Sequence, residues 1–227
     1  MKREMLMLLL ATSSLIMAKD ASDAGKRVEE ANQVFQEIMA APDKGIPQDL
    51  LDKAHCVVIV PGLKQGGFIV GAKYGKGVMA CRKAAGGWRG PAAIRVEGGS
   101  VGFQIGVGEV DTILLIMNER GAEKIMKSEF KLGGEAGAMA GPVGRSGAAE
   151  TDALMHAEIL GYSRSRGAFA GVAISGSTLR EDLDDNAALY GRRLTNVEIL
   201  SQGTGKPVAS GQSLLATLSK YSVWEKK

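Results

Sequence analysis

A glycine-rich stretch without acidic residues, running from Lys53 to Val96, constrains the fold of this chain more than any other feature of its sequence. Thirteen of the 31 glycines lie between Lys53 and Gly106, and they separate short apolar runs such as 56–60 and 77–81. Short apolar runs that are rich in β-branched residues and bounded by glycine predict strands. The stretch therefore predicts a strongly curved, mostly antiparallel sheet, with closure into a barrel as an open alternative.

The glycines divide this part of the chain into several expected strands. We expect turns at 74–76 and at 97–100, the second of them closing a hairpin. The run 110–117 is the most apolar of the set. The expected strands are 56–60, 68–70, 77–81, 92–96, 101–105 and 110–117, followed by two more at 156–163 and 169–174.

Helical periodicity appears on both sides of the strand region. Val28, Ala31, Phe35 and Ile38 recur at the spacing of one helix face within residues 20–41. Asn118 is suited to cap another helix. The fold class that follows is α+β, with several helices packed on the sheet in a single domain at 19–227. The expected helices are 20–41, 46–54, 119–129, 179–190, 196–200 and 213–223.

The N-terminus has the pattern of an export signal. Lys2 and Arg3 precede an apolar run at 5–17, which is shorter than the roughly 20 residues of a spanning helix. Cleavage after Ala18 would leave a mature domain in the periplasm or outside the cell, with peripheral attachment to a membrane as a further expectation. The alternative is the frayed first helix of a cytosolic protein.

The sequence does not match the motifs that we considered for catalysis, cofactor binding or metal binding. The glycine-rich segment 141–146 lacks the lysine of a phosphate loop, and 106–111 has Asp111 where a dinucleotide fingerprint has glycine. His55 and His156 have no partners at metal-ligand spacing. We therefore expect a non-enzymatic protein without a cofactor or a metal. A net charge of +3 is too small to argue for nucleic acid.

The chain contains two cysteines, Cys56 and Cys81, and both fall on expected strands. An oxidising compartment would let them form a disulfide between the first and the third strand. The alternative is a pair of buried free thiols.

A series of short blocks resembles the SYLF domain family, and these blocks follow the family order across nearly the whole mature chain. The resemblance implies a non-enzymatic module that binds anionic phospholipids, especially phosphoinositides, and fungal members are described as actin regulators. An exported chain without further domains is similar to stand-alone bacterial members. The blocks are 61–71, 74–77, 88–91, 100–106, 132–133, 140–145, 162–171, Asn186, 190–191 and 198–200.

The N-terminal segment that family members are thought to use for lipid is poorly basic in this chain. Lys19 to Glu30 carries three bases against four acids. The acid-free stretch is therefore the better candidate for a contact with an anionic membrane surface, where each base contributes about 1 kcal/mol. A protein-interaction or envelope-assembly module that does not bind lipid is the alternative. The predicted lipid-binding residues are Lys64, Lys73, Lys76, Arg82, Lys83, Arg89, Arg145, Arg164 and Arg166.

Overall fold

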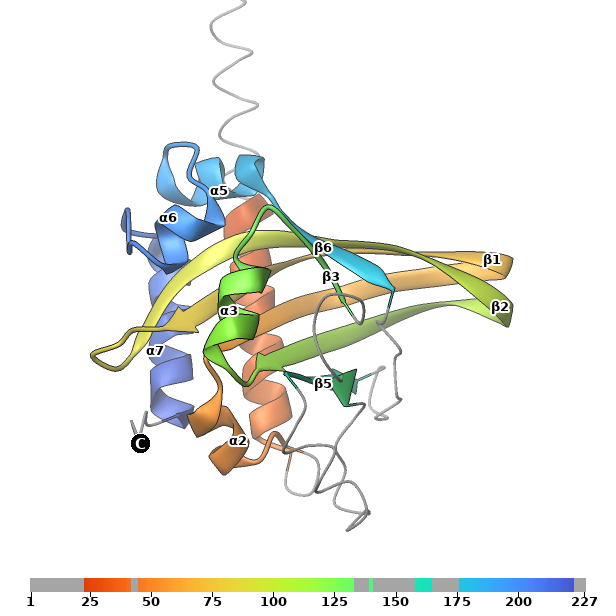
Figure 1. Ribbon diagram of the computed structural model, residues 1–227, viewed down its shortest axis with the longest axis horizontal. Helices are drawn as coiled ribbons and strands as arrows, with labels where there is room; N and C mark the ends of the chain where they lie inside the picture. Colours follow the sequence, from red (N-terminus) through yellow and green to blue (C-terminus); the bar gives the residue numbers. More distant parts are fainter. Residues whose placement is uncertain (1–22, 42–44, 133–138, 141–157, 165–175, 223–227) are drawn as a thin grey trace, which may run out of the picture.

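The computed structural model describes residues 23–41, 45–132, 139–140, 158–164 and 176–222 (Figure 1). The predicted export signal at 1–18, the expected strand at 169–174 and the predicted lipid-binding residues Arg145 and Arg166 lie outside these residues.

The centre of the fold is one long hairpin, formed by β1 (Cys56–Arg82) and β2 (Trp88–Ile116). The two strands pair antiparallel from Cys56 opposite Ile116 to Arg82 opposite Trp88. The predictions of separate short strands and of turns at 74–76 and 97–100 are therefore wrong. Gly75 pairs with Val96, so the two predicted turns lie opposite each other and continue the same ladder. The turn of the hairpin is at 83–87 instead.

The hairpin bends back on itself, so that the two halves of β1 run side by side (Figure 1). The backbone nitrogen of Arg82 donates to the carbonyl oxygen of His55 over 2.8 Å. Cys56 and Cys81 form a disulfide, which confirms their predicted pairing. The bond joins the two ends of a single strand, however, and not a first strand to a third.

Gly77 makes this close approach of the two halves of β1 feasible. A Cβ atom at position 77 would lie 2.2 Å from the carbonyl oxygen of Ile59, far inside any contact that a real side chain makes. Glycine within the expected strands thus marks a crossing of two backbone segments, and not a turn.

Four shorter strands extend the sheet, in the order β3-β6-β2-β5-β4 with β1 paired to β2. All pairs are antiparallel except β4 with β5. Among the described strands, no pairing joins β3 to β4, so the sheet is open and does not form a barrel over this part of the chain. The added strands are β3 (Glu129–Lys131), β4 (Met139–Ala140), β5 (Ile159–Arg164) and β6 (Ser177–Glu181).

The helices confirm the predicted α+β class, with corrections to their bounds. The helix expected at 213–223 begins earlier, at Ala209, and ends at Tyr221. The helix expected at 119–129 ends at Ile125, and the one expected at 179–190 begins at Leu183. Residues 179–181 belong to β6 instead, and Glu129 begins β3, where Phe130 pairs with Leu179 and both side chains are buried in the core. The helices are an N-terminal helix at 23–39, α2 (Gln48–Lys53), α3 (Glu119–Ile125), α5 (Leu183–Tyr190), α6 (Asn196–Leu200) and α7 (Ala209–Tyr221).

Both faces of the sheet are covered, which explains why its strands read as continuous apolar runs. Val57 and Ile59 face a core formed with the N-terminal helix and α7, and Val58 and Val60 face a second core with α3 and α6. Within the described part of the chain, no helix is long and apolar enough to cross a membrane.

Candidate functional site

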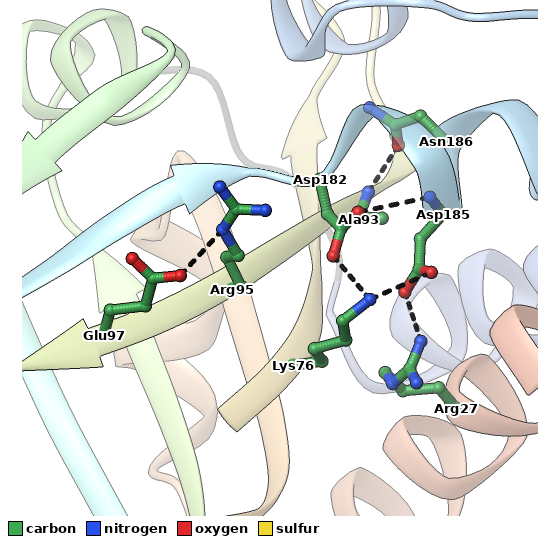
Figure 2. Close-up of polar contacts among 8 residues, drawn as sticks. All are labelled: Arg27, Lys76, Ala93, Arg95, Glu97, Asp182, Asp185 and Asn186. Carbon is green, nitrogen blue, oxygen red and sulfur yellow. Dashed lines mark hydrogen bonds and ion pairs between the residues drawn. The ribbon is translucent and has the colours of Figure 1, made fainter. Parts of the chain in front are cut away.

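Acidic residues from distant parts of the chain meet the acid-free stretch in the folded protein. The Nζ atom of Lys76 lies 2.8 Å from Oδ2 of Asp182 and 3.2 Å from Oδ1 of Asp185. Arg27 of the N-terminal helix pairs with the other oxygen of Asp185 (Figure 2). The cluster thus joins β1, the start of α5 and the N-terminal helix, and Lys76 contributes to the fold.

Electrostatics within this cluster favour the charged forms. Burial alone raises the pKa of Asp182, but the ammonium of Lys76, the backbone N–H of Asp185 and the charge of Arg95 together hold that pKa below its usual value. Burial lowers the pKa of Lys76, and the two aspartates outweigh this effect and raise it. Both groups are therefore ionised across the physiological pH range.

Asn186 fixes the same end of α5 to the sheet. Its Oδ1 atom accepts a 2.7 Å hydrogen bond from the backbone nitrogen of Ala93 on β2 (Figure 2). Its Nδ2 atom donates to the carbonyl oxygen of Leu194 and to Oδ1 of Asn196. The side chain is fully buried, so these bonds give α5 and α6 a defined position over β2.

Several other predicted lipid-binding residues also have partners inside the protein. Lys73 is buried, and this burial lowers its pKa. The guanidinium of Arg82 lies 4.0 Å from the ring centre of Trp88 and donates to the carbonyl oxygens of Leu51 and Ala54. Burial lowers the pKa of Arg82 to about 10. These two bases are not displayed on an open surface.

The remaining described bases lie on two separate parts of the surface. Lys64 is exposed and pairs with Glu109 over 3.6 Å. Arg164 binds both Glu37, over 2.5 Å, and Asp111, over 3.1 Å. Lys64 and Arg164 line one pocket of about 500 Å³ together with four acidic residues, which gives that pocket a negative character.

Lys83 and Arg89 lie on either side of the hairpin turn and line a different pocket. Together with Lys206 they line a pocket of about 410 Å³ between the turn and the loop that connects α6 to α7. No acidic residue lines this pocket among the described residues. We call the site formed by Lys83, Arg89 and Lys206 the basic cleft.

The loop between α6 and α7 is shaped around Arg89. Arg89 donates a hydrogen bond to the carbonyl oxygen of Ser201. Gly203 has a positive φ of 71°, and a Cβ atom there would lie 3.1 Å from Nε of Arg89. The sequence pattern did not indicate Lys206 as a site residue, because only the fold brings this loop to the hairpin turn.

A second pocket, of about 490 Å³, adjoins the basic cleft and shares Lys83 and Arg89 with it. We call it the disulfide pocket, because Cys56 and Cys81 form part of its lining. His55 lies in it between opposite charges. Burial lowers the pKa of His55, the carboxylate of Glu119 raises it, and the guanidinium of Arg82 lowers it.

Within the described residues, no group of three or more His, Cys, Asp or Glu side chains comes together in a way that could hold a metal ion. His156 lies outside those residues.

Comparison with known proteins decides the family. A family model described as "Ysc84: Las17-binding protein actin regulator", whose domain is also called SYLF, matches residues 97–221, which is more than half of the chain. The chain belongs to the SYLF (Ysc84) family. The family model covers α3, α5, α6, α7 and the second half of β2.

Curated relatives of this SYLF domain extend the match into β1. The chain is 32% identical to human SH3 domain-containing YSC84-like protein 1 over 209 residues, which cover 91% of this chain and 59% of the human protein. It is 37% identical to LAS seventeen-binding protein 3 of Saccharomyces cerevisiae over 183 residues, which cover 78% of this chain and 38% of the yeast protein. The chain thus spans well under two thirds of these relatives.

Proposed function

We propose that this SYLF domain is a non-enzymatic module that binds anionic phospholipid surfaces, with phosphoinositide-like headgroups as its ligands, through the basic cleft. The observation that carries the proposal is the lining of that cleft, in which Lys83, Arg89 and Lys206 come together and no described residue is acidic. Three bases at an anionic leaflet contribute about 3 kcal/mol together, which gives salt-sensitive binding.

The geometry of the cleft suits a contact with a surface. Lys83 and Lys206 are exposed, and the hairpin turn that carries Lys83 projects from one end of the molecule (Figure 1). Its residues at 84–87 are two alanines and two glycines, so no large side chain separates the turn from a flat surface. Arg89 adds a planar guanidinium that can bind phosphate through two N–H groups. An exported location with peripheral membrane attachment is part of this proposal.

Co-sedimentation with liposomes tests the proposal. The full chain should bind phosphatidylglycerol and phosphoinositide vesicles at low salt and dissociate as the salt concentration rises. The double variant Lys83→Glu/Lys206→Glu should lose this binding. The control Lys64→Glu/Lys131→Glu makes the same change in net charge at two exposed lysines outside the cleft, and it should retain most of the binding. Equal losses in both variants, or no binding by the unaltered chain, would reject the basic cleft as a lipid site.

Binding of a protein partner is the second candidate function. It is supported by the relatives, since the family is described as Las17-binding and the yeast relative is named a LAS seventeen-binding protein. Surface plasmon resonance with immobilised Las17 tests it directly. Saturable binding that survives Lys83→Glu/Lys206→Glu would assign the partner to a surface other than the basic cleft.

A further inference from the structure

The disulfide pocket has walls of opposite charge. The end of β1 and the hairpin turn supply Arg82 and Lys83 on one side, and α3 supplies Glu119 and Glu123 on the other. Figure 1 shows α3 in front of the sheet, toward the end of the molecule that carries the hairpin turn. Within the described part of the chain, neither Lys83 nor Glu123 forms an ion pair with another residue.

The opposite charges across this pocket select against simple ions. An anion with no positive group would meet the carboxylates of Glu119 and Glu123, and a simple cation would meet the charges of Arg82 and Lys83. A ligand that carries one negative and one positive group can face both walls at once. The basic cleft differs in this respect, because the charged residues of its described lining are all basic.

Beside the polar side chains of His55, Arg89 and Ser201, the lining of the pocket has an apolar part that suits a short carbon linker between two charges. It includes the Cys56–Cys81 disulfide, Met126 and Leu200. The volume of about 490 Å³ lies within the range of small-ligand sites. Apolar walls between two charged ends hold a ligand in one orientation, because reversing it would bring like charges together.

We propose that the disulfide pocket binds a phosphoethanolamine-type group, with its phosphate toward Lys83 and its ammonium toward Glu123 and Glu119. This proposal rests on the proposed function and deepens it. It names a zwitterionic headgroup that the protein binds in addition to the anionic lipids of the membrane surface. Lys83 and Arg89 line both sites, so a headgroup in the disulfide pocket lies next to the basic cleft. The same chemistry is present in phosphatidylethanolamine and in free phosphoethanolamine compounds.

Titration followed by amide NMR spectra tests the pocket without a membrane. Glycerophosphoethanolamine should shift the amide signals of 83–87 and of α3 in a saturable way. Glycerophosphoglycerol, which has a hydroxyl group in place of the ammonium, should bind at least about tenfold more weakly, the change expected for one charge-assisted hydrogen bond. Equal affinity for the two compounds, or no shift at these amides with either, would overturn the proposal.

A variant of α3 and a matched control test whether the acidic wall of the pocket contacts the ammonium. Glu123→Gln should weaken glycerophosphoethanolamine binding about tenfold and leave binding to phosphatidylglycerol vesicles intact. The control Glu30→Gln, on the exposed face of the N-terminal helix, should change neither. An unchanged affinity of Glu123→Gln for glycerophosphoethanolamine would show that α3 does not contact the ammonium, and it would reject the proposal.

A vesicle experiment separates the two sources of the ligand and the two proposals. Replacing phosphatidylcholine with phosphatidylethanolamine at constant phosphatidylglycerol should increase sedimentation of the unaltered chain, and Glu123→Gln should abolish the increase. Binding of the soluble compound with no such increase would identify a free phosphoethanolamine compound as the ligand. If the chain does not bind phosphatidylglycerol vesicles but the NMR titration is positive, the proposed membrane function is rejected and the proposed headgroup site is retained.

Discussion

The ammonium of Lys76 on β1 lies 2.8 Å from a carboxylate oxygen of Asp182, whose side chain is only 3% exposed. Asp182 is also the N-cap of α5, because its other oxygen accepts a hydrogen bond from the backbone nitrogen of Asp185. The pair therefore connects the bent hairpin to the helices that follow β6. It also explains why a base in a stretch without acids is not available to a ligand.

Replacing Lys76 with methionine should destabilise the protein strongly. Removing one partner of a buried ion pair costs about 3 kcal/mol or more, because the remaining charge loses its compensation. Urea unfolding should show this loss in the free energy of unfolding. Lys64→Met serves as the control, since the side chains of Lys64 and Glu109 are 70% and 45% exposed and their pair contributes less than about 1 kcal/mol. Equal effects of the two substitutions would contradict the structural role of Lys76.

The stabilising effect of this pair should depend on pH at both extremes. The pKa of Asp182 is lowered in the folded state despite burial, so its contribution is present above the unfolded value of about 3.9 and is lost as the pH falls through the folded value. The pKa of Lys76 is raised despite burial, so its contribution is present below about 10.4 and is lost as the pH rises through the folded value.

The difference in unfolding free energy between the unaltered chain and Lys76→Met should therefore be constant near neutral pH. It should narrow as the pH falls toward and below about 4, and again above about 10.4. Urea unfolding of both proteins across this range gives the measurement, and other titrating groups cancel in the difference. A difference that stayed constant throughout would show that the pair is not ionised in the folded protein.

Removing the Cys56–Cys81 disulfide should lower stability without changing the fold. The bond closes a loop across a sequence separation of 25 residues, for which the chain-entropy estimate is about 3.5 kcal/mol. Cys56→Ala/Cys81→Ala and reduction of the unaltered chain should give similar losses in urea unfolding. A reducing agent should have no effect on the double variant. Full stability of the reduced chain would contradict a role of the bond in holding the two ends of β1 together.

Gly77→Ala should prevent normal folding of the bent hairpin. Its Cβ atom would lie 2.2 Å from the carbonyl oxygen of Ile59 and 2.9 Å from Cα of Val60, and backbone atoms cannot move aside without separating the two halves of β1. We expect a loss of at least about 3 kcal/mol, or insoluble protein. Gly108→Ala is the matched control, because nothing lies within 4 Å of its Cβ position and a small effect is expected. Similar thermal stability of the two variants would disprove the close crossing.

Local sequence signals predicted most of the helices and the strand conformation of the apolar runs, although not how these runs connect. Val28, Ala31, Phe35 and Ile38 share the buried face of the N-terminal helix, as their spacing indicates. Asn118 caps α3, as predicted, by accepting a hydrogen bond from the backbone nitrogen of Gly121. These features depend on neighbours within one or two turns of the chain, so periodicity and residue type carry them.

Local sequence signals could not predict how the long hairpin bends and crosses itself. Glycine at a turn and glycine where two backbones cross give the same sequence signal, and only the position of Ile59 shows that Gly77 is of the second kind. The partners of the charged residues could not be predicted from the sequence either. A stretch without acids from Lys53 to Val96 predicted a positive surface, yet Asp182 and Asp185, about a hundred residues away in sequence, neutralise Lys76.

By itself the sequence left the pairing of the two cysteines open, while it determined the α+β class, the family resemblance and most of the helices. These follow from local periodicity, from residue type and from short blocks in a fixed order. The tertiary structure alone decided which bases remain accessible, because Lys83 and Arg89 meet Lys206 only when the α6–α7 loop packs against the hairpin turn. Charges act through space, so their partners are set by the fold and not by their order along the chain.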